Sequence, residues 1–452
     1  MRSVTVSSSL GIGGSRVRLS RCGPVLTIGR TAHLPFHQDL AGQPPTMRRV
    51  RRRAIVVFVT FVVAAAATAA TARSQASPLT TRLARALSVP HVPPARSAAL
   101  AVELTTGRTV FARHEALALV PASNQKLAVA FAALALLGPT HRFDTTVYGE
   151  GALVGQTWKG DLVLKGFGDP TLSRADLRAL AVQIRAFGIR RVSGDIEADE
   201  SYFDSRRTGP AWKSRYYLNE SPALSALTVD RARFRGWLTG DPALAAGTQF
   251  RLALRSVGVR VGGRAELGVA EPLAEQLAVT ESEPLQRILR YMDRESDNFT
   301  AEILLKQLGA VDEGVGTSAA GAKAVVRTLR HAAIPLTGVR IVDGSGLSPK
   351  NRLTAAALIG LLVAAWNNPV IRPAFVQSLP IAGVNGTLED RMEAPPARGA
   401  VLAKTGSTAE SSALSGYVRG RFAFAVLQNG RPVWHYWARR AQDRFAAVLA
   451  AQ

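Results

Sequence analysis

The most constraining feature of this 452-residue chain is a change in the spacing of its apolar residues that occurs twice. Residues 123–137 are almost wholly apolar and predict a buried helix that ends at Gly138. From about residue 143 to 279 the chain changes to short β-like runs separated by turns rich in glycine, aspartate and proline. Helical periodicity returns at residues 283–308. Helical segments on both sides of a β-rich middle predict an α/β (α+β) domain that is interrupted by an inserted domain.

The remaining segments complete the interrupted domain. Residues 97–113 predict two strands with Gly107 in the turn, and residues 351–366 predict another helix. Residues 399–410 and 412–430 are typical of adjacent strands, and a last helix ends the chain. We therefore expect the first part of the domain at residues 77–142, the insertion at 143–280 and the second part at 281–452.

Residues 47–76 have the organisation of a secretory signal. Arginines between positions 48 and 53 precede an apolar run, and small residues suitable for cleavage follow it. We interpret residues 1–46 as an extension without a function of its own, and we expect an exported protein of the cell envelope whose signal is cleaved. The alternative is an uncleaved anchor, because the apolar run approaches the length that spans a bilayer. The sole cysteine, Cys22, lies in this N-terminal stretch, so no intrachain disulfide can form.

The formal net charge of +23 does not by itself indicate a nucleic-acid partner. Ten of the arginines lie in residues 1–53, and the others are scattered singly without a basic block or interleaved aromatic residues. We therefore expect no nucleic-acid partner. Peripheral contact with a membrane or an anionic wall polymer stays open.

Lysine is scarce, since only 8 of the 56 basic residues are lysines, and one of them lies in the apolar helix. Lys126 follows Ser123 by three residues, and residues at that spacing share a helix face. Burial disfavours the ammonium group and lowers the pKa of a lysine, so a neutral Lys126 could accept the Ser123 proton. Arginine could not do so, because it does not deprotonate. The alternative is that Ser123 caps the helix while Lys126 extends to solvent.

Two further motifs support the catalytic interpretation. Residues 296–298 read Ser-Asp-Asn, and residues 404–407 read Lys-Thr-Gly-Ser. Ser-x-x-Lys, Ser-Asp-Asn and Lys-Thr-Gly together are the motif set of serine β-lactamases and penicillin-binding proteins. All three occur here in that order, and Ser-x-x-Lys and Lys-Thr-Gly occur once each. The set predicts a serine hydrolase that works through an acyl-enzyme.

Longer phrases extend the similarity over most of the chain. These phrases are LVPASNQKL, GDPTL, GDIEADESYFD, RESDNFTAEILL, VDGSGLSPKNRLT, SLPIAGVNGTLEDRM and AKTGS. From about residue 90 to the end, the chain resembles the D-alanyl-D-alanine carboxypeptidase/endopeptidase family, the class C low-molecular-mass penicillin-binding proteins. The resemblance implies a penicillin-binding/serine β-lactamase-like catalytic domain with an antiparallel sheet flanked by helices. The modest distance between Ser123 and Ser296 implies that the inserted part is reduced relative to longer family members.

The resemblance also implies the substrate and the catalytic roles. The enzyme would hydrolyse peptidoglycan stem peptides or their cross-links, and β-lactams would acylate and inhibit it. Ser123 would be the nucleophile and Lys126 its base, and Ser296 would pass the proton to the leaving amine. Asn298 would hold both Lys126 and the substrate amide. Lys404 would lower the pKa of the site through its charge.

The Lys-Thr-Gly-Ser segment has the implied role of binding substrate. The hydroxyls of Thr405 and Ser407, together with Lys404, suit a terminal carboxylate. Gly406 would leave room for a substrate that lies along the strand. The backbone N–H groups of Ser123 and Ser407 would form the oxyanion hole.

Other interpretations explain less of the sequence. A class A β-lactamase adds a glutamate that activates the deacylating water, and residues 330–347 offer none; class C enzymes have tyrosine where Ser296 stands. A Ser-His-Asp hydrolase is disfavoured, because no G-x-S-x-G motif surrounds a serine. No H-E-x-x-H motif and no second cysteine are present, so we expect no metal or cofactor. A non-enzymatic module that binds wall polymers would leave the three motifs unexplained.

Three further features are interpreted as structural. They are Asp297, Glu295 and the segment 343–351, whose sequence is DGSGLSPKN. The segment resembles the family's loop beside the catalytic cleft, and its glycines indicate tight turns. None of its side chains has an evident chemical task. Both carboxypeptidase and endopeptidase activity are compatible with all of these motifs.

Overall fold

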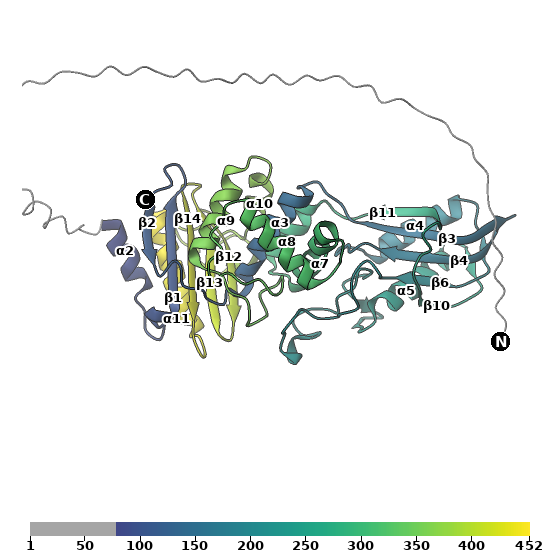
Figure 1. Ribbon diagram of the computed structural model, residues 1–452, viewed down its shortest axis with the longest axis horizontal. Helices are drawn as coiled ribbons and strands as arrows, with labels where there is room; N and C mark the ends of the chain where they lie inside the picture. Colours follow the sequence, from purple (N-terminus) through teal and green to yellow (C-terminus); the bar gives the residue numbers. More distant parts are fainter. Residues whose placement is uncertain (1–77) are drawn as a thin grey trace, which may run out of the picture. The chain divides into compact units, whose positions relative to one another are not determined.

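The computed structural model describes residues 78–452 (Figure 1). The expected extension at 1–46, the signal at 47–76 and Cys22 lie outside the described residues, so these assignments stay predictions. Within residues 78–452, no helix is both long enough and apolar enough to cross a membrane.

A five-stranded antiparallel sheet joins the two ends of the described chain. Its strands are β1 (Ser97–Glu103), β2 (Thr109–Arg113), β12 (Val401–Thr408), β13 (Ser411–Val418) and β14 (Phe422–Asn429). They lie in the order β12-β13-β14-β1-β2, so Ala101 pairs with Phe424 although more than 300 residues separate them. β12 is consequently an edge strand of this sheet, and part of its backbone is free to pair with another extended chain.

Helices cover both faces of this sheet, because its inner strands are apolar on both sides. β1 and β13 are buried along their whole length. Alternate side chains of a strand point to opposite faces. Leu100 therefore packs in the cluster that includes α9 (Ala355–Asn367), and Ala99 packs in the cluster of α2 (Pro78–Leu87) and α11 (His435–Ala450).

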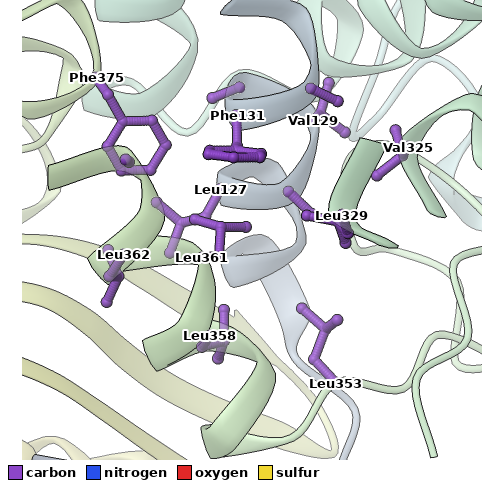
Figure 2. Close-up of a cluster of buried hydrophobic side chains, with 14 of the residues drawn as sticks. Leu127, Val129, Phe131, Val325, Leu329, Leu353, Leu358, Leu361, Leu362 and Phe375 are labelled. Carbon is purple, nitrogen blue, oxygen red and sulfur yellow. The ribbon is translucent and has the colours of Figure 1, made fainter. Parts of the chain in front are cut away.

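The helix α3 (Gln125–Leu137) is the central helix of this domain, and ten of its residues are buried. A helix that is apolar all round its circumference belongs inside a core. Figure 2 shows Leu127 and Phe131 of α3 facing the side chains of α9 and of α10 (Arg372–Ser378). Leu329 of α8 (Ser318–His331) lies on the other side of α3. Each fully buried Leu or Phe stabilises the fold by roughly 1.5–3 kcal/mol, which anchors the helix that carries Lys126.

A second sheet is built wholly from residues between Asp144 and Glu281. Its main path runs β10-β6-β4-β3-β11, and β5 and β9 pair with each other at its margin. The strands are β3 (Asp144–Val154), β4 (Thr157–Gly166), β5 (Arg191–Val192), β6 (Ile196–Asp199), β9 (Arg260–Val261), β10 (Ala265–Leu267) and β11 (Glu275–Glu281). This is the segment expected as the insertion. Its boundaries at 143 and 280 stay a prediction.

The middle segment also contains two helices that the sequence analysis did not predict. α4 (Arg174–Ala186) and α5 (Pro242–Ser256) pack on the second sheet in a shared apolar cluster. α4 buries Leu177, Leu180, Ala181 and Ile184, which follow the i, i+3, i+4, i+7 spacing of an amphipathic helix. The sequence analysis described this middle segment as β-rich and did not identify these two helices, whose helical signal lies between short strands.

The helical run predicted at 283–308 is divided into α6 (Leu285–Arg294) and α7 (Asn298–Glu313). The break lies at Ser296, whose φ of 56° is left-handed and cannot continue a helix. The Asp297 side chain then caps α7 by accepting a hydrogen bond from the Thr300 N–H. The remaining elements are η1 (Pro94–Arg96), η2 (Ala122–Asn124), η3 (Ser214–Tyr216), η4 (Gly386–Leu388), β7 (Arg233–Phe234) and β8 (Trp237–Leu238).

Candidate active site

The three motifs meet at one cavity of about 470 Å³. Ser123 comes from η2 in front of α3, Ser296 from the turn between α6 and α7, and Thr405 and Ser407 from β12. These segments are far apart in sequence, and the five-stranded sheet and the α3 core bring them together. The cavity is lined by Ser123, Ser296, Gly386, Thr387, Asp390, Arg391, Thr405, Ser407 and Arg439.

Ser123 is half-buried, whereas its neighbours on both sides are buried. The backbone around it is fixed by two segments. The Asn124 side-chain amide donates to the Lys404 carbonyl at 2.9 Å, which ties η2 to β12. A Cβ on Gly346 would lie 1.9 Å from the Ala122 carbonyl oxygen, so only glycine allows the loop at 343–346 to approach this closely. Ser123 is thus held at a constant position facing the cavity.

Lys126 is fully buried, and its Nζ atom has three close oxygen neighbours. Nζ lies 3.0 Å from Ser123 Oγ, 2.8 Å from Asn298 Oδ1 and 2.8 Å from the Ser345 carbonyl oxygen. The amide and carbonyl oxygens can only accept hydrogen bonds. A neutral amine would donate its two hydrogens to them, which leaves its lone pair directed to the Ser123 hydroxyl. The geometry therefore fits a neutral Lys126 that accepts the Ser123 proton.

The electrostatic environment shifts Lys126 towards the same protonation state, because it lowers the pKa. Burial lowers the pKa of Lys126 to about 8, and the carboxylates of Asp297 and Asp343 act in the opposite direction. None of the three atoms that contact Nζ carries a full charge. A lysine that is desolvated without a carboxylate in contact loses its proton readily.

The loop at 343–346 contacts the site through its backbone, which side-chain patterns could not indicate. The Ser345 carbonyl accepts from Lys126, and the N–H of Ser345 donates to the Glu302 carboxylate at 2.8 Å. The Asp343 carboxylate accepts from the Gly346 N–H at 2.9 Å and so closes the turn. Burial, and then the charge of Asp343, raise the pKa of Glu302. Glu302 and Asp343 are therefore positioning residues for the carbonyl that orients Lys126.

Loops of the middle segment hold the Ser-Asp-Asn motif. Asn298 Nδ2 donates to the Glu220 carbonyl at 2.9 Å, so both ends of this amide are fixed. Arg231 forms a bidentate ion pair with Asp297 and also lies over the rings of Tyr291 and Phe299. The structural interpretation of Asp297 agrees with these contacts and with its role as a helix cap.

Lys404 is fully buried and donates to the Thr405 carbonyl at 3.1 Å. Burial, and then the positive charge of Lys126, lower the pKa of Lys404, while Asp293 raises it. Asp293 is a buried carboxylate on α6, and the Ser378 hydroxyl donates to it at 2.7 Å. Among the hydrogen bonds of residues 78–452, none joins Ser296 to Lys126 or Lys404. The structure thus places Ser296 on the cavity wall without a hydrogen bond to either lysine among the described residues.

The Lys-Thr-Gly-Ser segment lies against the nucleophile. A Cβ on Gly406 would lie 2.8 Å from the Pro121 carbonyl oxygen and 3.1 Å from the Ser123 nitrogen. Glycine at 406 is therefore required by the backbone in front of Ser123, a reason different from the expected room for substrate. The same proximity brings together the two segments whose N–H groups are the expected oxyanion donors. The Thr405 hydroxyl contacts Thr387 Oγ1 at 2.7 Å.

Sequence reasoning missed several residues of this site. Asp293 lies four residues after Leu289, so an acidic residue occupies a position on the apolar face of α6, and this was a readable signal. Thr387 and Arg439 line the cavity from η4 and α11. Thr387 lies in the phrase SLPIAGVNGTLEDRM, which indicated the family but gave this residue no role, and Arg439 lies in none of the quoted phrases. In residues 78–452, no group of three or more His, Cys, Asp or Glu side chains could hold a metal ion.

Comparison with known proteins places this geometry in context. A model of the D-Ala-D-Ala carboxypeptidase 3 (S13) family matches residues 79–239 and 235–452. A D-alanyl-D-alanine carboxypeptidase of an Actinomadura species is 32% identical over 357 residues, which cover 60% of this chain and 65% of that protein. Carboxypeptidase DacB of Mycolicibacterium smegmatis is 32% identical over 316 residues, with coverage of 64% and 67%. This chain thus spans about two thirds of the length of these relatives.

Solved structures have the same fold. The crystal structure of penicillin binding protein 4 (dacB) from Haemophilus influenzae matches with a TM-score of 0.72 at 22% identity, over 82% of this chain and 98% of that chain. A second structure of that protein, in complex with a β-lactam, matches with a TM-score of 0.66 at 22% identity and the same coverage. The fold class expected from the sequence is thereby confirmed, apart from the two helices of the middle segment.

Proposed function

Because this chain belongs to the D-Ala-D-Ala carboxypeptidase 3 (S13) family, we propose that it is a serine-type D-Ala-D-Ala carboxypeptidase or endopeptidase. Its substrates are peptidoglycan stem peptides or the cross-links between them, and the reaction proceeds through an acyl-enzyme. The observation that carries this proposal is the contact of buried Lys126 with Ser123 at 3.0 Å. This pair supplies the activated nucleophile that acyl transfer requires.

Acylation follows from the positions of the groups. Ser123 Oγ attacks the carbonyl carbon of the penultimate D-alanine, and its proton passes to Lys126 Nζ. The carbonyl oxygen becomes an oxyanion that accepts hydrogen bonds from the N–H groups of Ser123 and Ser407. The hydroxyls of Thr405 and Ser407 hold the carboxylate of the leaving residue, and Arg439 adds a positive charge at the same end of the cavity.

The leaving group then departs as an amine. Its nitrogen takes the proton that Lys126 accepted, by way of the Ser296 hydroxyl, and the carbon–nitrogen bond breaks. The product is an ester between Ser123 and the remaining peptide. Water hydrolyses this ester, giving its proton to Lys126 in the same manner, and restores free Ser123.

Penicillin is the simplest probe of this proposal, because its ring carbonyl acylates the same serine and its ring nitrogen stays attached. We expect a fluorescent penicillin to label the wild-type protein at Ser123 and not to label Ser123→Ala. Mass analysis of treated muropeptides identifies the reaction, since a carboxypeptidase removes one D-alanine and an endopeptidase converts dimers into monomers. Rapid release of hydrolysed penicillin with no change in the muropeptides would instead identify a β-lactamase.

The location of the protein is part of the proposal. Peptidoglycan lies outside the cytoplasmic membrane, so the enzyme must be exported, and residues 47–76 have the composition of a signal. We expect the mature protein to begin at Arg73 or Ser77. N-terminal sequencing of the protein from cell envelopes tests this expectation. Recovery of the protein from the cytosol with residues 1–46 intact would contradict it.

A further inference from the structure

An exposed aromatic cluster lies at the start of α11 and consists of His91, Trp434, Tyr436 and Trp437; we call it the aromatic rim. The His91 ring stacks on Trp434 with ring centroids 4.7 Å apart and approaches Trp437 at 6.4 Å. Tyr436 meets Trp437 edge to face at 5.1 Å. Trp434 and Tyr436 are nevertheless 55% and 63% exposed. The rings fix one another's positions and still present a large apolar surface to solvent.

The aromatic rim is continuous with the candidate active site. His435 lies 3.0 Å from the Thr408 carbonyl through its Nε2 atom, which ties the start of α11 to the end of β12. Arg439 lines the cavity and contacts Ser407 Oγ at 3.5 Å. Tyr436 precedes Arg439 by three residues and therefore lies on the same face of α11. Tyr436 is therefore the residue of the aromatic rim that stands next to a lining residue of the cavity.

The chemistry of the aromatic rim suits a ligand with both apolar and polar faces. Aromatic rings pack on apolar C–H groups, and their exposed edges and faces are enriched where proteins bind partners. Arg440 donates to the Tyr436 hydroxyl at 2.9 Å and lies over the Trp437 ring, so a donor-rich guanidinium stands beside the rings. An amino sugar linked to a peptide offers C–H faces for the rings and amide and hydroxyl oxygens for the guanidinium.

The direction of the substrate decides which part of it reaches this surface. Under the proposed function, Thr405 and Ser407 hold the carboxylate of the residue whose amine leaves. Arg439 contacts Ser407 and is next to Tyr436 on α11, so the aromatic rim adjoins the residues that hold this carboxylate. In a pentapeptide the leaving group is one D-alanine, which ends inside the cavity. In a cross-link the leaving group is a second stem peptide that carries its own sugar.

We propose that the aromatic rim binds the second muropeptide of a peptidoglycan cross-link, on the leaving-group side of Ser123. This inference rests on the proposed function and deepens it. The aromatic rim makes cross-linked dimers better substrates than pentapeptides, because only the dimers reach Trp434 and Tyr436. It adds no group to the reacting atoms.

The experiment compares two substrates on the same active site. Steady-state kcat/KM is measured for a cross-linked disaccharide-peptide dimer and for a soluble pentapeptide, with wild type, Trp434→Ala, Tyr436→Ala and the double variant. The matched control is Trp237→Ala, which removes another exposed aromatic ring that is 80% exposed in β8. We expect the double variant to lose about ten-fold in kcat/KM on the dimer, as for removal of an aromatic anchor from an interface. Pentapeptide turnover and penicillin acylation should match those of Trp237→Ala.

Each other outcome overturns the inference. Equal losses on both substrates would show that the variants damage the cavity. An unchanged dimer rate would show that the aromatic rim binds no muropeptide. Loss of binding to phosphatidylglycerol vesicles, with dimer cleavage intact, would assign the surface to a membrane. If removal of Trp434 disturbs folding through His91, the single variant Tyr436→Ala decides the question.

Failure of the proposed function is recognised separately. Dimer binding is measured by calorimetry in the Ser123→Ala background, where no acyl-enzyme can form. Binding that depends on Tyr436 while the wild type takes no penicillin label would reject the proposed function and retain the aromatic rim as a binding surface. Penicillin labelling of the wild type without Tyr436-dependent dimer binding would retain the proposed function and reject the aromatic rim as a binding surface.

Discussion

Lys126 and Lys306 are both fully buried, and the difference between their surroundings explains their different uses. Lys306, on α7, donates to the Asp204 carboxylate at 2.5 Å and to the Arg206 carbonyl at 2.9 Å, and so joins α7 to the middle segment. Lys126, on α3, contacts a hydroxyl, an amide oxygen and a carbonyl oxygen. One lysine has a carboxylate in contact, and the other has only neutral oxygens.

The difference shows how the surroundings suit one residue type to a structural ion pair in one place and to the proposed role of a base in another. Burial lowers the pKa of Lys306 too, but the Asp204 carboxylate opposes this effect. At Lys126 the carboxylates act only from a distance, and burial lowers the pKa to about 8. A buried ammonium with a partner stays charged and stabilises a contact, whereas one without a partner is ready to lose its proton.

The largest expected effect is on acylation when Lys126 can no longer become neutral. Lys126→Arg keeps a positive charge but cannot deprotonate, so we expect penicillin acylation at pH 7.5 to fall about a thousand-fold or more, close to the loss in Ser123→Ala. Stopped-flow or gel labelling with a fluorescent penicillin measures the rate. Thermal unfolding should show that both variants fold. Near-normal acylation of Lys126→Arg would contradict the contrast between Lys126 and Lys306, because a permanently charged group at position 126 would then be enough for acylation.

The next effect is expected at Lys404, whose ammonium group makes its only hydrogen bond among the described residues to the neighbouring Thr405 carbonyl. Lys404→Arg keeps the charge on a wider group, so we expect measurable penicillin binding but a loss of about 100-fold in peptidase turnover. Lys404→Ala should lose both activities. The charges of Lys404 and Lys126 disfavour each other, so loss of Lys404 should raise the pKa of Lys126 and move the acid limb of acylation to higher pH. If the acid limb of acylation does not move in Lys404→Ala, Lys404 does not change the pKa of Lys126, and a role in holding substrate remains.

The comparison of the two lysines can also be tested by removing the carboxylate that contacts Lys306. Asp204→Asn leaves this lysine buried with only neutral oxygens, as at Lys126, and we expect a loss of about 3 kcal/mol in unfolding free energy at pH 7. The pKa of Lys306 in the folded state would fall further below its unfolded value. Stability of the variant should therefore recover as pH rises from 7 towards 10, because the unfolded chain then binds fewer extra protons.

Chemical denaturation at pH 7 and 9.5 measures this recovery. The matched control is Asp312→Asn, which removes a carboxylate from an ion pair with Arg327. The Arg327 side chain is 41% exposed. We expect a cost below about 1 kcal/mol and no recovery at higher pH for that control. A deficit in Asp204→Asn that is the same at both pH values would mean that Lys306 keeps its proton without its partner.

The smallest effect is expected at Asp293. Its negative charge raises the pKa of both Lys126 and Lys404, so Asp293→Asn should lower both values. More Lys126 would then be neutral below pH 8, and we expect acylation at pH 6.5 to rise about two- to five-fold with no change at pH 9. Asp312→Asn, which lies near the far end of α7, is again the control for loss of one carboxylate. A slower rate at pH 6.5 would assign Asp293 a structural role.

Much of the fold could be predicted from the sequence, because α3 and the strands β12 to β14 have strong apolar patterns of their own. The predicted strands at 97–113 and 399–410, the turn at Gly107 and the end of α3 at Gly138 are found in the structure, whereas the run at 412–430 forms two strands, β13 and β14. The helices α4 and α5 were missed, since each lies among short strands whose pattern dominated the interpretation. Ser296 shows a different limit. Its left-handed backbone interrupts residues 283–308, for which the apolar periodicity predicted one continuous helical run.

The candidate site could be predicted only where chemistry resides in recognisable side-chain motifs. Ser123, Ser296 and the Lys-Thr-Gly-Ser segment were identified because their order and spacing are specific. The Ser345 carbonyl and the Glu220 carbonyl were not, because every residue has a backbone carbonyl and only the fold determines which one faces a lysine. For the same reason, the sequence could not show that loops of the middle segment orient Asn298.

The most direct test of Lys126 as the base is the pH dependence of penicillin acylation by the wild type, from about pH 5.5 to 9.5. Acylation requires the neutral amine, so the rate should rise with pH, reach half its plateau near the pKa of about 8 and level off above it. Asp204→Asn should keep the same midpoint, because Lys306 is not in contact with Ser123. A rate that stays level between pH 6 and 9, or a midpoint that moves in Asp204→Asn, would contradict the assignment of Lys126 as the base.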